Sequence, residues 1–410
     1  MPVTLDDIRT AAAALEGQVV RTPSVMAPRL AEATGAAAVV LKLENMQYTG
    51  SFKDRGAFVK LRSLRPEEAK AGVIAMSAGN HAQGVAYHAQ RLGIPATIVM
   101  PKGAPFTKVE RTRSFGARVL LEGDGIDAAA VFARELAKRE GLVFVHPYDD
   151  EKIIAGQGTI GLELLSDHPD LDQIVVPIGG GGLISGIATA AKALKPEIEI
   201  VGVEAALYPS MRDAIRGLAP GSGGVTLAEG IAVKSPGTLT RAIIERLVPH
   251  IVLADEDALE QAVIMMAEVQ KLVTEGAGAA GLAAMLADRH RFAGKRVGVI
   301  VCGGNIDVRL LSQVLMRGLV RDGRVMTLRI EILDAPGVLG RIGNIIGAAG
   351  GNIIEIHHQR LFFDLPVKRA DIDAVIEARN PTHVQEIIGA LTKAGFPARR
   401  LSGRSSAEHG

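Results

Sequence analysis

Short apolar runs alternate with helical patterns between residues 35 and 320. Residues 73–76, 96–100 and 297–301 form such runs, which contain β-branched residues and show no polar alternation. Runs of this kind are typical of strands covered on both faces, as in parallel α/β sheets. Further runs lie at residues 119–121, 143–145, 174–176 and 200–203. The pattern predicts an α/β fold with more than one parallel sheet.

The pattern changes after Gly323. Residues 324–332 alternate between two faces, one with Val325, Thr327, Arg329 and Glu331 and the other with Met326, Leu328, Ile330 and Ile332. The elements expected next are a helix over 338–349, strands over 352–359 and 370–378, a helix over 382–394 and a strand over 398–401. This β-α-β-β-α-β order, over about eighty residues, is that of a ferredoxin-like unit. We expect the small and polar residues 403–410 to form a flexible tail.

Composition narrows the class of protein. A chain of 410 residues is long enough for two or three domains, and its net charge of +1 with no long basic run argues against nucleic acid as a partner. We expect neither a signal peptide nor a membrane span, because no long apolar segment is present. The single cysteine, Cys302, excludes an intramolecular disulfide and a cysteine-built metal site. These features predict a cytoplasmic enzyme.

The segment TGSFKDRGA, residues 49–57, places Lys53 among small residues and directly after Phe52. A lysine that forms a Schiff base needs room around its amine and little water, because desolvation lowers its pKa towards a nucleophilic value. Pyridoxal 5'-phosphate (PLP) is held through such a lysine, and its ring can lie against an aromatic side chain. The alternative interpretation is a loop lysine beside a buried phenylalanine.

Gly179, Gly180, Gly181 and Gly182 follow a predicted strand and precede a helix expected to begin near Leu183. Successive residues without Cβ let backbone N–H groups converge on an anion at a helix N-terminus. Each such bond to a phosphate contributes roughly 1.5–3 kcal/mol, enough to retain a cofactor while its covalent link is broken. The segment lacks the lysine of a nucleotide P-loop and the spacing of a dinucleotide fingerprint. A flexible turn is the alternative.

Two further segments follow predicted strands. Ser77, Ala78, Gly79, Asn80 and His81 offer a hydroxyl, backbone amides and a helix N-terminus, which suit a carboxylate. Helix capping is the alternative for Ser77 and Asn80, and a packed side chain is the favoured interpretation for His81. Cys302 opens the segment CGGNID. It can be a thiol nucleophile, a buried structural thiol, or a neutral partner for a ring nitrogen, and no histidine partner that would activate it is visible.

Four motifs occur in one order: TGSFKDRGA at 49–57, SAGNHAQG at 77–84, GGGGLISG at 179–186 and CGGNID at 302–307. In this order they resemble the PLP-dependent threonine ammonia-lyases (threonine dehydratases) and the related serine dehydratases and serine racemases, over about residues 10–320. Residues 324–401, with DAPGVL at 334–339, resemble an ACT regulatory domain. The combination is similar to the threonine ammonia-lyases that carry a single C-terminal ACT domain.

The resemblance implies a catalytic region of the tryptophan-synthase-β-like fold, known as fold type II. It implies residues 1–322 for this region, with a small subdomain of about 48–150 inserted in a large one formed by 1–47 and 151–322, and an ACT domain over 323–402. Lys53 would carry the cofactor and take the substrate Cα proton, and Phe52 would flank the ring. Gly179, Gly180, Gly181, Gly182 and Leu183 would hold the phosphate. Asn80 would bond the ring hydroxyl.

The resemblance also implies that Ser77, Ala78, Gly79, Asn80 and His81 bind the substrate carboxylate. Cys302 stands where most relatives have serine and would be the neutral partner of the ring nitrogen, which leaves a weaker electron sink than an aspartate partner. In the ACT domain, an amino-acid effector such as isoleucine or valine would bind near Asp334, Gly337, Leu339 and Asn352, where two units meet. A homodimer or homotetramer is implied.

Three departures from the family pattern bear on this prediction. Ala78 replaces the second serine that serine racemases keep, so efficient racemisation is not expected. Glu204 is not followed by the second acid of the racemase-type divalent metal site, so no metal site is expected. Asp54 is shared with threonine synthases, but the CGGN segment and the ACT unit argue against that identity. The predicted activity is deamination of L-threonine to 2-oxobutanoate and ammonia, with weaker activity on serine. The alternatives are a serine or 3-hydroxyaspartate dehydratase and a non-catalytic amino-acid sensor.

Overall fold

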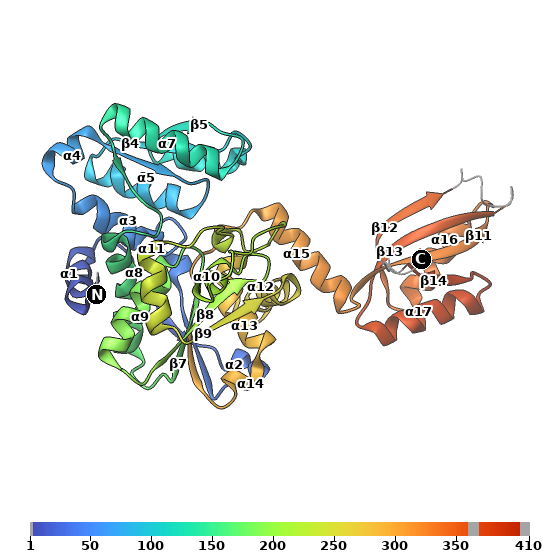
Figure 1. Cartoon of the computed structure of the whole chain (residues 1–410). Helices are drawn as coiled ribbons and strands as arrows, with labels where there is room; N and C mark the ends of the chain where they lie inside the picture. The colour runs from blue at the N-terminus through green and yellow to red at the C-terminus, as the bar shows by residue number, and fades with distance from the viewer. Residues whose placement is uncertain (1–2, 360–368, 402–410) are drawn as a thin grey trace. The chain divides into compact units, whose positions relative to one another are not determined.

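A computed structural model describes residues 3–359 and 369–401. The chain folds into two compact units, Met1–Ile306 and Asp307–Gly410 (Figure 1). The first unit contains two mainly parallel sheets and the second contains one antiparallel sheet. The tail predicted over residues 403–410 lies outside the described residues.

The larger sheet of the first unit has six strands in the order β1-β2-β10-β7-β8-β9. Its strands are β1 Ser24–Met26, β2 Ala38–Lys42, β7 Gln173–Pro177, β8 Glu199–Ala205, β9 His250–Ala254 and β10 Arg296–Ile300. Only β1 is antiparallel to its neighbour among these six strands. The central strands β2, β7 and β10 are almost fully buried, which explains why their sequences are apolar without alternation.

The smaller sheet has four parallel strands in the order β5-β4-β3-β6. They are β3 Val73–Met76, β4 Ala96–Met100, β5 Arg118–Leu121 and β6 Val143–Phe144. All four come from one continuous stretch of the chain, between the first two and the last four strands of the larger sheet. Each strand of this sheet coincides with an apolar run that the sequence marks as a strand, whereas β1, β2 and β9 were not singled out.

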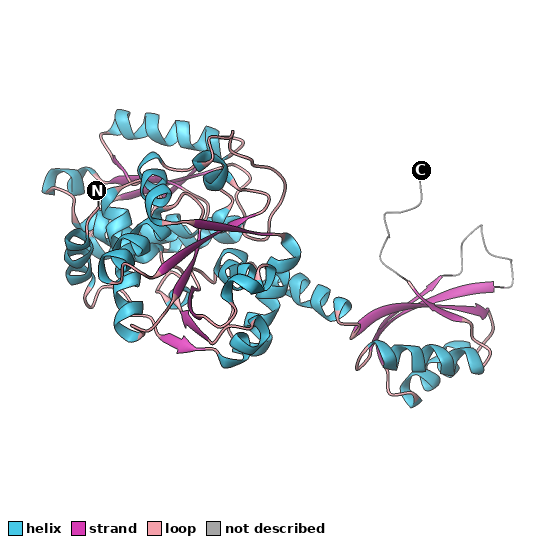
Figure 2. Ribbon diagram, turned by 60° about the horizontal axis from the view of Figure 1, so that its bottom comes forward, coloured by secondary structure: helices cyan, strands magenta, loops and turns pink. Residues whose placement is uncertain are grey.

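Helices connect the strands and cover the sheets (Figures 1 and 2). The helices of the first unit are α1 Leu5–Leu15, α2 Pro28–Thr34, α3 Lys53–Arg62, α4 Pro66–Ala71, α5 Asn80–Leu92, α6 Phe106–Ser114, α7 Ile126–Glu140, α8 Glu151–Asp167, α9 Gly182–Leu194, α10 Ser210–Ile215, α11 Thr238–Leu247, α12 Glu256–Gln270, α13 Gly276–Ala287 and α14 Arg289–Phe292. Short 3-10 helices lie at η1 Glu44–Met46 and η2 Glu229–Ile231.

Local chemistry sets several helix ends. Asp150 caps the N-terminus of α8 and accepts hydrogen bonds from two backbone N–H groups of the first turn, and Asp255 caps α12 in the same way with one. Gly93 and Gly141 end α5 and α7 with φ of 67° for both, the left-handed conformation that glycine adopts without strain. The two glycine ends lead into strands β4 and β6.

A buried ion network lies beneath α3. Arg55 is fully buried and makes paired hydrogen bonds to Glu44, at 2.8 Å for each pair of atoms, and to Glu163, at 2.6 and 2.8 Å. Lys42 is also buried and donates to Glu163 at 2.6 Å. Because Arg55 follows Lys53 by two residues, this network fixes the start of α3 to η1, β2 and α8.

The second unit begins with α15 Val308–Arg321 and has the element order β11 Val325–Leu333, α16 Val338–Ala348, β12 Asn352–Gln359, β13 Arg369–Glu377, α17 Pro381–Lys393 and β14 Ala398–Arg400. Its sheet is antiparallel, in the order β12-β13-β11-β14. Figure 2 shows α16 and α17 on the same face of this sheet. The face of β11 that bears Met326, Leu328, Ile330 and Ile332 packs into the core, as the alternation predicts.

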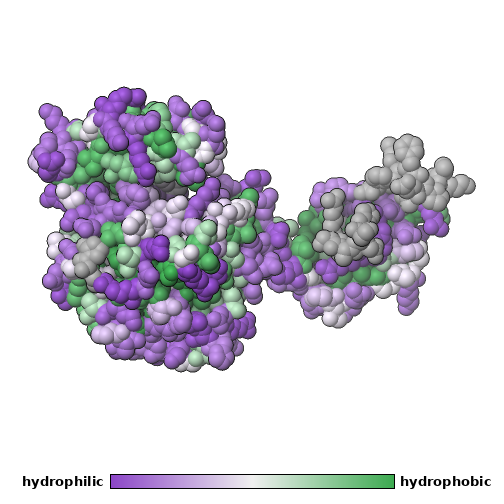
Figure 3. Space-filling view, in the orientation of Figure 1, coloured by the Kyte–Doolittle hydropathy of each residue, from purple (hydrophilic) through white to green (hydrophobic). Residues whose placement is uncertain are grey.

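The surface of the first unit that is visible in Figure 3 is mainly hydrophilic, with small hydrophobic patches. In the part of the chain that the structure describes, no helix combines the length and apolar character needed to cross a membrane.

Candidate active site

Segments from both sheets of the first unit meet around Lys53. The chain leaves β2, passes through η1, and reaches Lys53 as the first residue of α3. Ser51 forms an isolated antiparallel bridge with Gly303, and the N–H of Phe52 donates to the carbonyl of Cys302 at 3.0 Å. The lysine segment is therefore tied to the segment that follows β10. Ligand sites of α/β sheets characteristically lie at these carboxyl ends of strands.

The Lys53 amine is partly buried and donates to the carbonyl oxygen of Pro147 at 2.7 Å. Burial lowers the pKa of this amine to about 8, although Cys302 and Glu275 oppose the shift. The amine lies 5.0 Å from the centre of the Phe52 ring. A lowered pKa and an aromatic neighbour are the properties expected of a lysine that reacts with an aldehyde.

The glycine segment after β7 is closely packed. Gly181 has a φ of +96° and precedes the first residue of α9. A Cβ at Gly180 would overlap the ring of Tyr148, and one at Gly182 would lie 2.9 Å from the Tyr148 carbonyl oxygen. The carbonyl of Gly180 also accepts from the Thr240 hydroxyl at 2.7 Å. The segment is therefore held in place, and a flexible turn does not describe it.

The segment after β3 leads into α5, which begins at Asn80. The N-cap residue is Gly79 and no side chain caps this helix, so capping does not account for Ser77 or Asn80. Ser77 Oγ accepts from the Gly79 N–H at 3.1 Å. His81 is buried, its Nε2 lies 3.0 Å from the Val145 carbonyl oxygen, and burial lowers its pKa to about 3. His81 is therefore a neutral, packed side chain.

Glu275 is a site residue that the sequence interpretation did not include. It precedes α13, and its carboxylate accepts from Nδ2 of Asn80 at 2.8 Å. Burial raises the pKa of Glu275 to about 7, although the Asn80 hydrogen bond opposes this. Its signal in the sequence is that Glu275 is the sole charged residue between Lys271 and Asp288. Tyr148 was missed as well, because only the fold brings it to the glycine segment.

Cys302 lies two residues after the end of β10 and is 3% exposed. Burial raises the pKa of its thiol well above the usual value, so the group is neutral at ordinary pH. A Cβ at Gly278 of α13 would overlap the carbonyl oxygen of Gly303, so α13 packs directly against this segment. A neutral thiol does not fit a nucleophile, and the other two interpretations of Cys302 stand.

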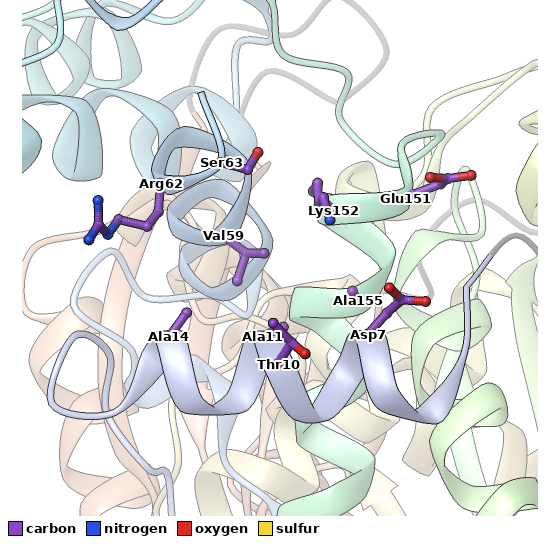
Figure 4. A pocket seen from close by; sticks show the side chains of 10 residues that line it. All are labelled: Asp7, Thr10, Ala11, Ala14, Val59, Arg62, Ser63, Glu151, Lys152 and Ala155. Carbon is purple, nitrogen blue, oxygen red and sulfur yellow. The ribbon is translucent and has the colours of Figure 1, made fainter. Parts of the chain in front are cut away.

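Two other features lie outside this cluster. Glu204 accepts from the N–H groups of Met211 and Arg212 at 2.7 and 3.0 Å, and no group of three or more potential metal ligands occurs among residues 3–359 and 369–401. A hollow of about 160 Å³ lies where α1, α3 and α8 meet (Figure 4), and none of the predicted site residues lines it. Its lining residues are Asp7, Thr10, Ala11, Ala14, Val59, Arg62, Ser63, Glu151, Lys152 and Ala155.

In the second unit the predicted effector residues lie at opposite ends of the sheet. Asp334, Gly337 and Leu339 follow the end of β11 that pairs with Arg369, whereas Asn352 pairs with Glu377 at the other end. Eight residues of strand separate the two ends, roughly 25 Å. The prediction that Asn352 is close enough to complete a pocket at this loop is therefore wrong within one unit, because β12 begins level with the start of β11, on the other side of β13. A hollow of about 350 Å³ lies at the Asn352 end.

The cluster around Lys53 fits a phosphate-bearing aldehyde. A protein-family profile described as "Pyridoxal-phosphate dependent enzyme" matches residues 15–303. The chain belongs to the pyridoxal-phosphate dependent enzyme family. The residues of the site agree with this, since Lys53 supplies an amine of lowered pKa and the glycine segment before α9 carries no side chain where it packs against Tyr148.

Individual proteins similar to this chain include ammonia-lyases and a racemase. The chain is 44% identical to an L-threonine ammonia-lyase from Thermotoga maritima over 399 residues, which are 97% of this chain and 99% of that protein. Maize serine racemase has a similar structure, with a TM-score of 0.72 and 34% identity over 78% of this chain and 99% of that one. Threonine deaminase isoform 2 from Solanum lycopersicum gives a TM-score of 0.71 and 34% identity over 76% and 86%. The prediction of a fold type II catalytic region is confirmed.

Proposed function

We propose that this protein is an ammonia-lyase that converts L-threonine into 2-oxobutanoate and ammonia. The observation that carries the proposal is the Lys53 amine of lowered pKa, held between Phe52 and the Pro147 carbonyl in a family member. The name of the 44% identical relative, which matches nearly the whole chain, supports threonine as the substrate.

The residues that would hold PLP come from the segments that contain Lys53, Asn80, the four glycines and Cys302. Gly179, Gly180, Gly181, Gly182 and Leu183 lie at the start of α9, where the N–H groups of the first turn have no partner inside the helix and can bind the phosphate. Phe52 would flank the ring and Asn80 would donate to its hydroxyl oxygen. Lys53 would be the covalent anchor.

When bound, PLP supplies an electron sink that makes the substrate Cα–H acidic and lets the β-hydroxyl leave. Lys53 would take the Cα proton, since burial lowers the pKa of its amine to about 8. The N–H groups and hydroxyl of residues 77–81 would hold the substrate carboxylate at the beginning of α5, where the helix dipole favours a negative group. Threonine then loses water. The unsaturated amine that results takes up one water and releases ammonia, so the net reaction consumes no water.

Cys302 would face the ring nitrogen as a neutral group. Burial raises the pKa of its thiol, so it neither gives a proton readily nor carries a charge that would favour a pyridinium. A neutral partner limits the electron sink and suits departure of the β-hydroxyl soon after loss of the Cα proton.

A keto-acid release assay with purified enzyme and added PLP tests the function. The substrates are L-threonine, L-serine and the 3-hydroxyaspartates, each compared by kcat/KM. We expect L-threonine to be the best substrate and L-serine a poorer one. A higher kcat/KM for serine or 3-hydroxyaspartate would replace threonine as the substrate, and no keto acid from any of them would leave the amino-acid sensor as the better hypothesis.

We infer that the second unit is a ferredoxin-like ACT domain that pairs with a second copy and binds an amino-acid effector. The β-α-β-β-α-β order and the antiparallel sheet support this. Gly337 has a φ of +83° and directly precedes α16, and the N–H groups at the start of that helix suit a carboxylate. Leu333, Leu339 and Ile354 are exposed apolar residues, and Figure 3 shows hydrophobic patches on this unit. They give a second copy an apolar surface to cover.

An antiparallel pairing of two units would bring the Asp334 end of one beside the Asn352 end of the other. A pocket made from both ends therefore requires a dimer or a larger assembly. Asp334→Ala and Asn352→Ala should each reduce the response of kcat/KM to isoleucine or valine, while the enzyme without effector keeps its activity. If both variants respond as the unmodified protein does, and the oligomer seen by sedimentation is unchanged on truncation after Gly323, the regulatory proposal fails.

A further inference from the structure

A chain of hydrogen bonds crosses the candidate active site. Arg111 on α6 donates Nη1–H to Oδ1 of Asn305 at 2.8 Å, and Asn305 donates Nδ2–H to Oδ1 of Asn80 at 2.7 Å. Asn80 donates Nδ2–H to Oε1 of Glu275 at 2.8 Å. Arg111 and Asn80 come from the stretch that forms the smaller sheet, whereas Asn305 and Glu275 lie beside the larger one. The chain therefore joins the two halves of the site.

The ends of this chain decide which way the two amides point. A guanidinium group can only donate, and an ionised carboxylate can only accept. Asn305 must therefore direct its carbonyl oxygen to Arg111, and Asn80 must direct its amide nitrogen to Glu275. The orientation of Asn305 is fixed a second time, because its Nδ2 also donates to the Thr49 carbonyl at 2.7 Å.

This arrangement leaves one side-chain N–H of Asn80 without an acceptor among the described residues. Its Oδ1 accepts from Asn305, and Glu275 is the acceptor that the described residues provide for its Nδ2. An amide nitrogen carries two hydrogens, so one N–H of Asn80 remains for a ligand. If the amide were turned over, the oxygen would face the ligand instead, and a phenolate oxygen would be repelled rather than bound.

We propose that Asn305 and Glu275 are positioning residues that hold the amide of Asn80 so that its remaining N–H faces the ring oxygen of bound PLP. The inference rests on the proposed function only through the contact of Asn80 with the cofactor. Glu275 is anchored for this task, because its own N–H donates to the Gly303 carbonyl at 3.2 Å and a Cβ at Gly303 would come 2.5 Å from its Oε1.

The test compares Glu275→Ala, Asn305→Ala and Asn80→Ala, alone and as the pairs that include Asn80→Ala, in the full chain loaded with PLP. Spectra are recorded at about pH 8, because the acceptor must be ionised and burial raises the pKa of Glu275 to about 7. The readouts are the ratio of the two absorption bands of bound PLP, which reports the charge on its ring oxygen, and the apparent Kd for PLP. Loss of one such hydrogen bond should raise the Kd by about tenfold.

We expect each single variant to change the band ratio in the same direction as Asn80→Ala. In the Asn80→Ala background, Glu275→Ala and Asn305→Ala should then change it no further, because both act through Asn80. Glu275→Gln, which keeps an acceptor, should retain the spectrum of the unmodified protein. If Glu275→Ala does not fold, Asn305→Ala tests the same point and keeps the buried carboxylate of Glu275 with its Asn80 partner.

The control is Asn380→Ala, which removes the N-cap of α17 in the second unit and should lower stability without altering the spectrum. The proposal would be overturned if Glu275→Ala or Asn305→Ala changed the band ratio further in the Asn80→Ala background. It would also be overturned if the folded single variants kept the band ratio of the unmodified protein. These spectra test the positioning role even if keto-acid release shows that threonine is not the substrate.

Discussion

Replacing Arg55 with alanine should lower the free energy of unfolding of the first unit by about 3–5 kcal/mol, the usual cost of breaking a buried ion pair. Arg55 and Glu44 have no exposed surface, and Arg55 makes two hydrogen bonds to each of Glu44 and Glu163. Glu163 would keep Lys42 as its partner. The loss therefore falls mainly on Glu44, which would keep hydrogen bonds from Thr22 and Gln47 and the nearby charge of Lys42.

The stability lost in Arg55→Ala should be larger at high pH than at low pH. Burial alone would raise the pKa of Glu44, but Arg55 overcomes it and holds this pKa below its usual value. The native pair therefore contributes stability above the unfolded pKa of about 4.3, and this is lost as pH falls through the lower folded value. Without Arg55 the folded pKa of Glu44 rises, because burial disfavours its charged form, so the stability lost relative to the native protein grows as pH rises.

Thermal unfolding of the native protein, Arg55→Ala and Arg55→Lys, at about pH 5 and about pH 8, measures this. A loss of this size should lower Tm by roughly 5–10 °C at the higher pH, and less at the lower pH. Arg55→Lys should lose less, because it keeps a charge but not the paired geometry. Because α3 begins at Lys53, kcat should fall with Tm. A Tm of Arg55→Ala within about 1 °C of the native value, or a loss equal at both pH values, would refute this account.

Three further predictions concern the candidate site. Lys53→Ala should lower ammonia release from threonine by at least about 10²-fold while the far-UV spectrum stays native, and appreciable turnover would remove Lys53 from the mechanism. Ala78→Ser should raise D-serine formation from L-serine relative to elimination, because it adds a hydroxyl donor to the 77–81 segment; a folded variant without detectable D-serine would show that this position does not face the substrate Cα. Cys302→Asp should lower kcat more than Cys302→Ser, since only aspartate brings a charge to this buried position. Equal kcat values for the three proteins would mean that Cys302 does not face the ring nitrogen.

The sequence by itself determined the classes of element and the main chemistry. Apolar runs without polar alternation, such as residues 174–176, predicted buried parallel sheets. A strand that is covered on both faces has no face that must carry polar side chains. The alternation over residues 324–332 indicated a sheet with one covered face for the corresponding reason. Lys53 and the glycine segment were visible because their chemistry needs particular residue types at adjacent positions.

The tertiary structure alone decided which distant residues meet. Glu275 and Asn80 are separated by 195 positions, and Tyr148 reaches the glycine segment only because the end of the smaller sheet lies there. Contacts between residues far apart in the chain produce no periodic pattern in the sequence, since the residues next to each of them do not indicate which distant residue it will contact. The same holds for Asn352, whose place follows from strand register and not from its nearness in the chain to the loop before α16. Register depends on which strands pair, and pairing is settled by packing of the whole unit.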